Sequence, residues 1–137
     1  MRIEGLLKVG IAVNDMAGAV SRYSEILGLS PGEIVTYDRY GMRYCLFSMS
    51  DFFLELMEPT TPDGPIGRFI ETHGEGVQHL SIRVSNIEET MAELKGKGFR
   101  LVQDTPLREH VGFGIANFAF VRPQSAHGVV LQLVQVE

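Results

Sequence analysis

The stretch Leu6–Leu29, LLKVGIAVNDMAGAVSRYSEILGL, decides the fold, because its pattern returns later in the chain as Val77–Phe99, VQHLSIRVSNIEETMAELKGKGF. Each stretch begins with residues that alternate between apolar and small or polar, which predicts a strand with two different faces. Asp15 or Asn86 follows, a residue type that caps helices, and an apolar stripe of helical spacing comes next. A glycine then ends each helix. Each half of the chain therefore opens with a strand and a helix.

The two halves keep one constant offset. Lys8 precedes His79 by 71 positions, and Asp15 precedes Asn86 by 71 positions as well. The pattern predicts an α+β fold class made of tandem βαβββ modules. Three further β-like runs follow each helix, at residues 33–37, 43–49 and 52–58 in the first half and at 100–103, 115–121 and 129–136 in the second.

The repeat also bounds the domain organisation. At 137 residues the chain fits one compact domain that buries about two thirds of the surface of its unfolded form. We place one module at about 5–59 and the other at about 76–136 of this single domain, 1–137. The linker 60–75 reads as a turn, a short helix that begins at Pro65 and a glycine-rich end.

Composition and charge narrow the class of partner. The net charge of −5 opposes attraction to phosphate backbones, so we expect no nucleic-acid partner. The longest apolar runs are too short for a bilayer span, so we expect no membrane partner and a cytoplasmic location. The single cysteine, Cys45, lies in an apolar run and suits a reducing compartment, so we interpret it as a core residue.

The last strands of the two halves match each other as well. Residues 53–58, FLELME, correspond to residues 130–135, VLQLVQ. Duplicated modules related by a pseudo-two-fold axis bring equivalent positions together near that axis. We therefore expect one cluster of four side chains, namely Lys8, Glu55, His79 and Gln132.

Over nearly its whole length the sequence resembles the vicinal-oxygen-chelate superfamily of glyoxalases, extradiol dioxygenases and bleomycin-resistance proteins, and most closely the methylmalonyl-CoA epimerase family. The resemblance implies that the two modules curl into one mixed sheet with an open cleft, and that the chain forms a homodimer. It is carried by VGIAVNDMAGAVSRYSEILGL at 9–29, LELMEPTTPDGPIGRFIETHGEGVQHLSIRV at 54–84 and FVRPQSAHGVVLQLVQ at 120–135.

The resemblance also implies a divalent metal held by one side chain from the first and last strand of each module. The family's usual ligands are His, Gln or Glu, His and Glu, and this chain has Lys8, Glu55, His79 and Gln132 in their places. A protonated lysine has no lone pair to donate, and an ammonium beside a dication is costly in a partly buried site. Gln132 also lacks the charge of the usual glutamate. We therefore expect either no cofactor or a weakly held divalent metal at Glu55, His79 and Gln132.

The implied activity is proton transfer on a small acyl-CoA or 2-oxo acid, of the isomerase, epimerase or lyase type. Lys8 could stabilise the enolate oxygen in place of a metal, and Glu55 or His79 could act as the base. Gln132 cannot accept a proton, so the sequence favours chemistry with one base. The alternative is a binding module that holds a small molecule without turnover, as in the bleomycin-resistance branch.

Three residues are candidates for contact with the substrate. Ser125 and His127 match a loop that lines the acyl-thioester pocket in the epimerase family. Asp38 lies near the place where that family carries a second acidic base. The phosphates of a CoA tail could be bound by Arg68, Arg83 and Arg122.

Overall fold

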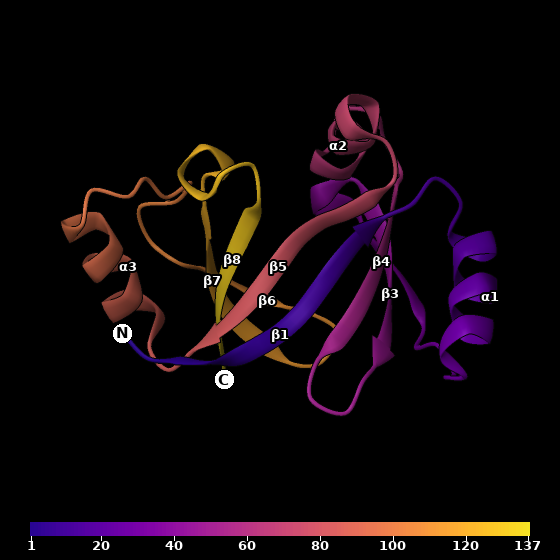
Figure 1. The fold of residues 1–137 in the computed structure, drawn as a ribbon, viewed down its shortest axis with the longest axis horizontal. Helices are drawn as coiled ribbons and strands as arrows, with labels where there is room; N and C mark the ends of the chain where they lie inside the picture. The colour runs from indigo at the N-terminus through magenta and orange to yellow at the C-terminus, as the bar shows by residue number, and fades with distance from the viewer. The chain divides into compact units, whose positions relative to one another are not determined.

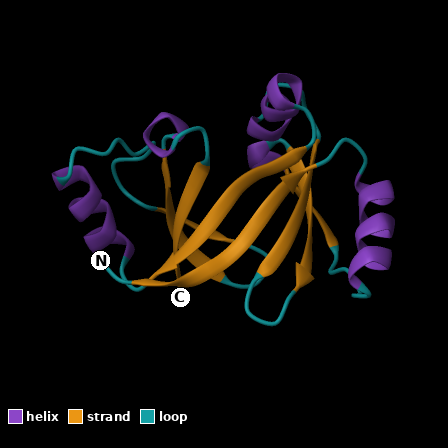
Figure 2. Cartoon of the chain, in the orientation of Figure 1, coloured by secondary structure: helices purple, strands orange, loops and turns teal.

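The computed structural model describes residues 1–137 and contains the predicted order of elements twice. Figures 1 and 2 show the strands of the chain with helices beside them. The order strand, helix and three strands occurs in both halves, so the α+β class and the glyoxalase-like tandem βαβββ fold are confirmed. The elements are β1 (Ile3–Ala12), α1 (Met16–Leu27), β2 (Ile34–Tyr37), η1 (Asp38–Tyr40), β3 (Met42–Ser48), β4 (Phe53–Pro59), α2 (Pro65–His73), β5 (Gly76–Val84), α3 (Ile87–Gly96), β6 (Leu107–His110), β7 (Ile115–Val121), η2 (Pro123–Ala126) and β8 (Val130–Val136).

The chain divides into two compact units. The first unit is residues 8–78, and the second unit is residues 1–7 together with 79–137. Within the first unit the strand order is β2-β3-β4-β1, with β1 parallel to β4 and the other pairs antiparallel. Within the second unit the order is β5-β8-β7-β6, with β5 parallel to β8. None of the helices has the length and apolar character needed to span a bilayer.

In the first unit the two faces of the sheet pack against different helices. Met16 of α1 packs against one face, in a core with Phe47 and Leu56. Ile66 of α2 packs against the other face, beside Tyr44. Figure 1 shows α1 flanking β3 and α2 near one end of β4. The helix α2 has only nine residues, and the polar side chains of Lys8 and Glu55 lie on the same face of the sheet.

Cys45 belongs to the core on the α1 face, as the sequence predicted. Its side chain is fully buried, and its thiol donates a weak hydrogen bond to the Gly32 carbonyl oxygen at 3.4 Å. Burial raises the pKa of the Cys45 thiol, which disfavours the reactive thiolate. The residue therefore has a structural role.

In the second unit α3 packs against one face of the sheet, in a core that includes Ile87 and Leu133. One predicted strand is wrong here: residues 100–103 form only a single bridge, between Leu101 and Val121. The Gln103 side-chain oxygen accepts a hydrogen bond from the Phe120 amide at 2.9 Å. The backbone hydrogen bonds between residues 100–103 and β7 therefore do not extend into a strand ladder. The edge strand is instead β6, which pairs with β7 a few residues later.

The helix starts in the two units are held by equivalent strand residues. Asp15 stands at the start of α1 as predicted, but its side chain makes no capping bond. The Met16 amide instead donates to Glu58 of β4 at 2.6 Å. In the second unit the Ile87 amide donates to Gln135 of β8 at 2.8 Å. Both helix starts therefore depend on the last strand of their own module.

Asn86 adds a local cap to α3, as the sequence predicted. Its side-chain oxygen accepts the Glu89 amide at 3.0 Å. This satisfies a donor that the first turn of a helix otherwise leaves unpaired. The start of α3 is thus fixed both locally and by the last strand.

Candidate functional site

The central feature of the first unit is a buried ion pair between Lys8 and Glu55. The Lys8 Nζ donates to the Glu55 Oε1 at 3.1 Å, and the two side chains are only 10% and 4% exposed. The parallel register sets Lys8 beside Phe53 and Gly10 beside Glu55. Because Gly10 has no side chain, the lysine stem can extend along the strand to the carboxylate. The predicted proximity of Lys8 and Glu55 is confirmed.

Tyr44 of β3 lies on the same face of the sheet as this pair. Leu46 is directly opposite Glu55 in the antiparallel register, and Tyr44 is opposite Met57 two residues further along. The Tyr44 side chain is nearly buried, at 8% exposure. Burial, and after it the negative charge of Glu55, raises the pKa of the Tyr44 phenol. Tyr44 was not among the residues predicted from the sequence, because the register between β3 and β4 cannot be read from strand alternation alone.

In the second unit His79 and Gln132 lie on one face of the sheet with Ser81. His79 is 6% exposed, and Ser81 is fully buried. The register pairs Ser81 directly with Gln132, and the Ser81 hydroxyl donates to the Gln132 Oε1. This hydrogen bond satisfies the buried amide oxygen of Gln132. The partner is Ser81, which was not among the four predicted residues.

The two units differ in charge at equivalent positions. Glu55 corresponds to Gln132, and Glu58 corresponds to Gln135, so both carboxylates of β4 become amides in β8. Gly10 corresponds to Ser81. Glu55 therefore lies beside a glycine in the first unit, whereas Gln132 lies beside a serine in the second unit. The first unit therefore carries a charged pair where the second carries a neutral one.

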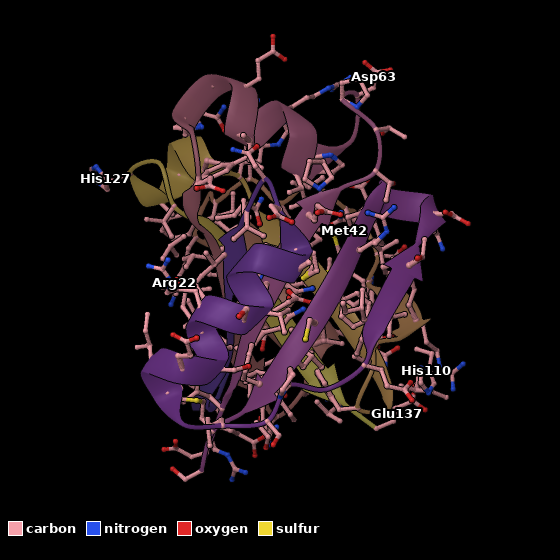
Figure 3. The ribbon with its side chains drawn as sticks, turned by 90° about the vertical axis from the view of Figure 1, so that its right-hand side faces the viewer. Arg22, Met42, Asp63, His110, His127 and Glu137 are labelled. Atoms are coloured by element: carbon pink, nitrogen blue, oxygen red, sulfur yellow. The ribbon has the colours of Figure 1, made fainter.

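The predicted substrate-contact residues lie outside these buried groups. Asp38 is exposed in η1, and Ser125 is half-buried in η2. His127 is exposed, has a left-handed backbone with φ of 55° and projects outward in Figure 3. The three candidate phosphate-binding residues are also exposed, namely Arg68, Arg83 and Arg122.

The metal-ligating potential of the structure is limited. No group of three or more His, Cys, Asp or Glu side chains is arranged to hold a metal ion. In the first unit the Glu55 Oε1 accepts a hydrogen bond from Lys8. In the second unit the Gln132 Oε1 accepts one from Ser81. The oxygens with which Glu55 and Gln132 could bind a cation are thus partly occupied by protein donors.

Comparison with known proteins places the chain in a family. Residues 7–120 match the glyoxalase/bleomycin resistance protein/dioxygenase superfamily. The human mitochondrial methylmalonyl-CoA epimerase is 31% identical over 130 residues, which cover 93% of this chain and 71% of the human protein.

Solved structures agree with this assignment. The methylmalonyl-CoA epimerase from Mycobacterium tuberculosis superposes with a TM-score of 0.89 and 31% identity, over 98% of this chain and 89% of that chain. A methylmalonyl-CoA epimerase in complex with methylmalonyl-CoA and NH4+ superposes with a TM-score of 0.87 and 27% identity, over 98% and 96% of the two chains. With its tandem βαβββ order and a match over residues 7–120, the chain belongs to the glyoxalase/bleomycin resistance protein/dioxygenase superfamily.

Proposed function

We propose that this protein catalyses proton transfer at the carbon next to the thioester of a small acyl-CoA, as an epimerase-like enzyme. The observation that supports this proposal is the buried ion pair of Lys8 and Glu55, a cation and a carboxylate on one face of the sheet. The similarity to methylmalonyl-CoA epimerases supports acyl-CoA as the substrate class. The same pair would also suit a 2-oxo acid, which carries a comparable acidic C–H bond.

The two charged side chains would divide the reaction between them. The Glu55 carboxylate would accept the α-proton, which leaves an enolate with its negative charge on the former carbonyl oxygen. The Lys8 ammonium would donate a hydrogen bond to that oxygen, and a charged donor is most effective in a site that excludes water. His79 is the second residue that we propose as a base, because it is buried and its neutral imidazole can accept a proton.

The donor set does not fit the divalent metal that the family resemblance implies. Lys8 occupies one ligand position, and as an ammonium it donates hydrogen bonds and no lone pair. Gln132 brings no charge, and its carbonyl oxygen already accepts from Ser81. We propose that the Lys8 ammonium takes the place of the cation. A relative solved in complex with methylmalonyl-CoA and NH4+ supports this idea, because that protein accommodates an ammonium ion together with the substrate.

Purified protein is expected to hold well below one equivalent of zinc, cobalt, nickel or manganese after dialysis. The reason is the loss of two ligands, since one position is a cation and another a neutral amide. Elemental analysis of the dialysed protein, with the protein concentration from amino-acid analysis, measures this directly. One equivalent of bound metal would show that the Lys8 amine is deprotonated or displaced. It would contradict the proposal that the Lys8 ammonium takes the place of the metal cation.

The remaining features are proposed from the family resemblance. We propose that residues 1–137 act as one domain, with modules at about 5–59 and 76–136, and that the chain forms a homodimer. The substrate would be contacted by Ser125, His127 and Asp38.

The function is tested by hydrogen exchange at the α-carbon. In deuterated water the protein is expected to incorporate deuterium into methylmalonyl-CoA or a related acyl-CoA far faster than buffer does, because Glu55 removes the α-proton reversibly. Mass spectrometry of the recovered acyl-CoA measures the incorporation. Binding of the acyl-CoA with no exchange would favour a binding module, and neither binding nor exchange would exclude this substrate class.

A further inference from the structure

Gln132 presents a hydrogen-bond donor at the position where its counterpart Glu55 presents only acceptors. The Gln132 Oε1 accepts a hydrogen bond from the Ser81 hydroxyl, so the part of the amide that is left for another partner is its NH2 group. Gln132 is only 6% exposed, and a donor in so dry a place is costly unless it meets an acceptor. The two modules therefore differ in hydrogen-bond polarity as well as in charge.

The neighbours of Gln132 limit where that acceptor can come from. Ser81 of β5 lies directly beside Gln132, and Phe120 of β7 lies directly opposite it on the other side. The Phe120 ring meets the Phe118 ring edge to face, with centroids 5.8 Å apart, and carries no oxygen or nitrogen. Side chains stand roughly perpendicular to a sheet, so an acceptor reaches the NH2 group from the side of the sheet opposite to α3.

The charge on this face suits an anionic acceptor. The strands β5 and β8 contain no aspartate or glutamate, and their only arginine or lysine is Arg83. Arg83 follows Ser81 by two residues and is paired with Val134, so it lies on the face that bears Gln132. On these two strands a negatively charged group would meet a neutral donor and a cation, and no carboxylate that repels it.

We propose that Gln132 determines specificity by donating a hydrogen bond to a carboxylate on the α-carbon of the substrate, and that Ser81 is a positioning residue that holds the amide in its donating orientation. This inference rests on the proposed function, in which the Lys8 ammonium serves the enolate oxygen. His79, the second proposed base, precedes Ser81 by two residues on the same face, about 6–7 Å along the strand. A substrate bound over this face would lie within reach of both His79 and Gln132.

Ser81 is needed because the two ends of an amide differ. Without the Ser81 hydroxyl, the Gln132 amide can turn over and present its oxygen, which repels a carboxylate. In the first unit the position of Ser81 is taken by Gly10, beside Glu55. The two oxygens of a carboxylate are equivalent, so Glu55 requires no neighbour of this kind.

The test compares two thioesters that differ only in the α-carboxylate, methylmalonyl-CoA and propionyl-CoA. The Gln132→Met variant keeps the length and apolar volume of the side chain and removes the N–H donors. It is expected to weaken the binding of methylmalonyl-CoA by about 10–100-fold, the usual range for a hydrogen bond to a charged group, and to change that of propionyl-CoA by less than about twofold. Isothermal titration calorimetry measures both dissociation constants, and circular dichroism shows whether the variant is folded.

The Ser81→Ala variant tests the positioning role. It is expected to weaken the binding of methylmalonyl-CoA by about 3–10-fold, because part of the amide population turns over. Combined with Gln132→Met it should have no further effect, since no amide is left to orient. A serine with a merely structural role would weaken both thioesters, or would add its own loss to that of Gln132→Met, and either result overturns the role of Ser81.

Gln135→Met is the matched control, because Gln135 lies on the same strand but on the α3 face, where it bonds the Ile87 amide. It should leave the ratio of the two dissociation constants unchanged. If Gln132→Met weakens both thioesters equally, or neither, Gln132 does not recognise the carboxylate. If the unchanged protein exchanges the α-proton of methylmalonyl-CoA but binds both thioesters equally well, this inference alone is overturned. Absence of both binding and exchange overturns the proposed function as well.

Discussion

Replacing Lys8 by methionine is expected to lower the free energy of unfolding by about 3–5 kcal/mol, because the change leaves the Glu55 carboxylate buried without its counter-charge. The Lys8 and Glu55 side chains are 10% and 4% exposed, so water cannot easily replace the ammonium. Methionine keeps most of the apolar volume of the lysine stem, so packing changes little. Urea unfolding followed by circular dichroism at neutral pH measures the loss.

Two companion variants separate the charge from other effects. Lys97→Met removes an exposed lysine that pairs with Glu93 one helical turn away, and it should leave the stability nearly unchanged. Lys8→Met combined with Glu55→Met removes both charges, and it should recover most of the loss, since apolar pairs often replace buried ion pairs at no cost. A loss for Lys8→Met no larger than that for Lys97→Met would show that the ion pair is solvated in solution.

Replacing Glu55 by glutamine is expected to slow α-proton exchange by about 10²–10⁴-fold, the usual contribution of a general base. The amide has the size of the carboxylate and can still accept the Lys8 hydrogen bond, but it cannot take up a proton. The assay is deuterium incorporation into methylmalonyl-CoA, with circular dichroism to confirm that the variant is folded.

Glu58→Gln is the matched control for this variant. Glu58 lies on the same strand but on the α1 face, where it caps Met16. The equivalent residue Gln135 holds the start of α3 with an amide, so an amide at position 58 should be tolerated. Exchange by Glu58→Gln should match the unchanged protein. Undiminished exchange by Glu55→Gln would exclude Glu55 as the base and leave His79 as the next candidate.

The repeat carried most of what the sequence could predict. Two strand and helix patterns at one constant offset gave the module twice, and the matching last strands put Lys8 and Glu55 at neighbouring positions. Their contact is observed across the parallel pair β1 and β4, where Lys8 donates a hydrogen bond to Glu55. The repeat therefore indicated which positions on the first and last strands of a module lie close together.

The features that depend on pairing between strands were not predicted. Tyr44 was missed because its position relative to Glu55 is set by the turn between β3 and β4, which alternation does not encode. The edge strand of the second unit was placed at 100–103, whereas β6 begins at Leu107. The Gln103 side chain competes for the Phe120 amide there, and such a side-chain bond leaves no signal in the sequence pattern.

The way in which α1 and α3 are held has a consequence for how the chain acquires its structure. The Met16 and Ile87 amides are bonded by residues 42 and 48 positions away, on β4 and β8. Those partners reach the helix only after a long loop has closed, which is slow compared with helix formation itself. A nascent α1 has no local side-chain cap and would fray until β4 has docked, whereas Asn86 already caps the first turn of α3.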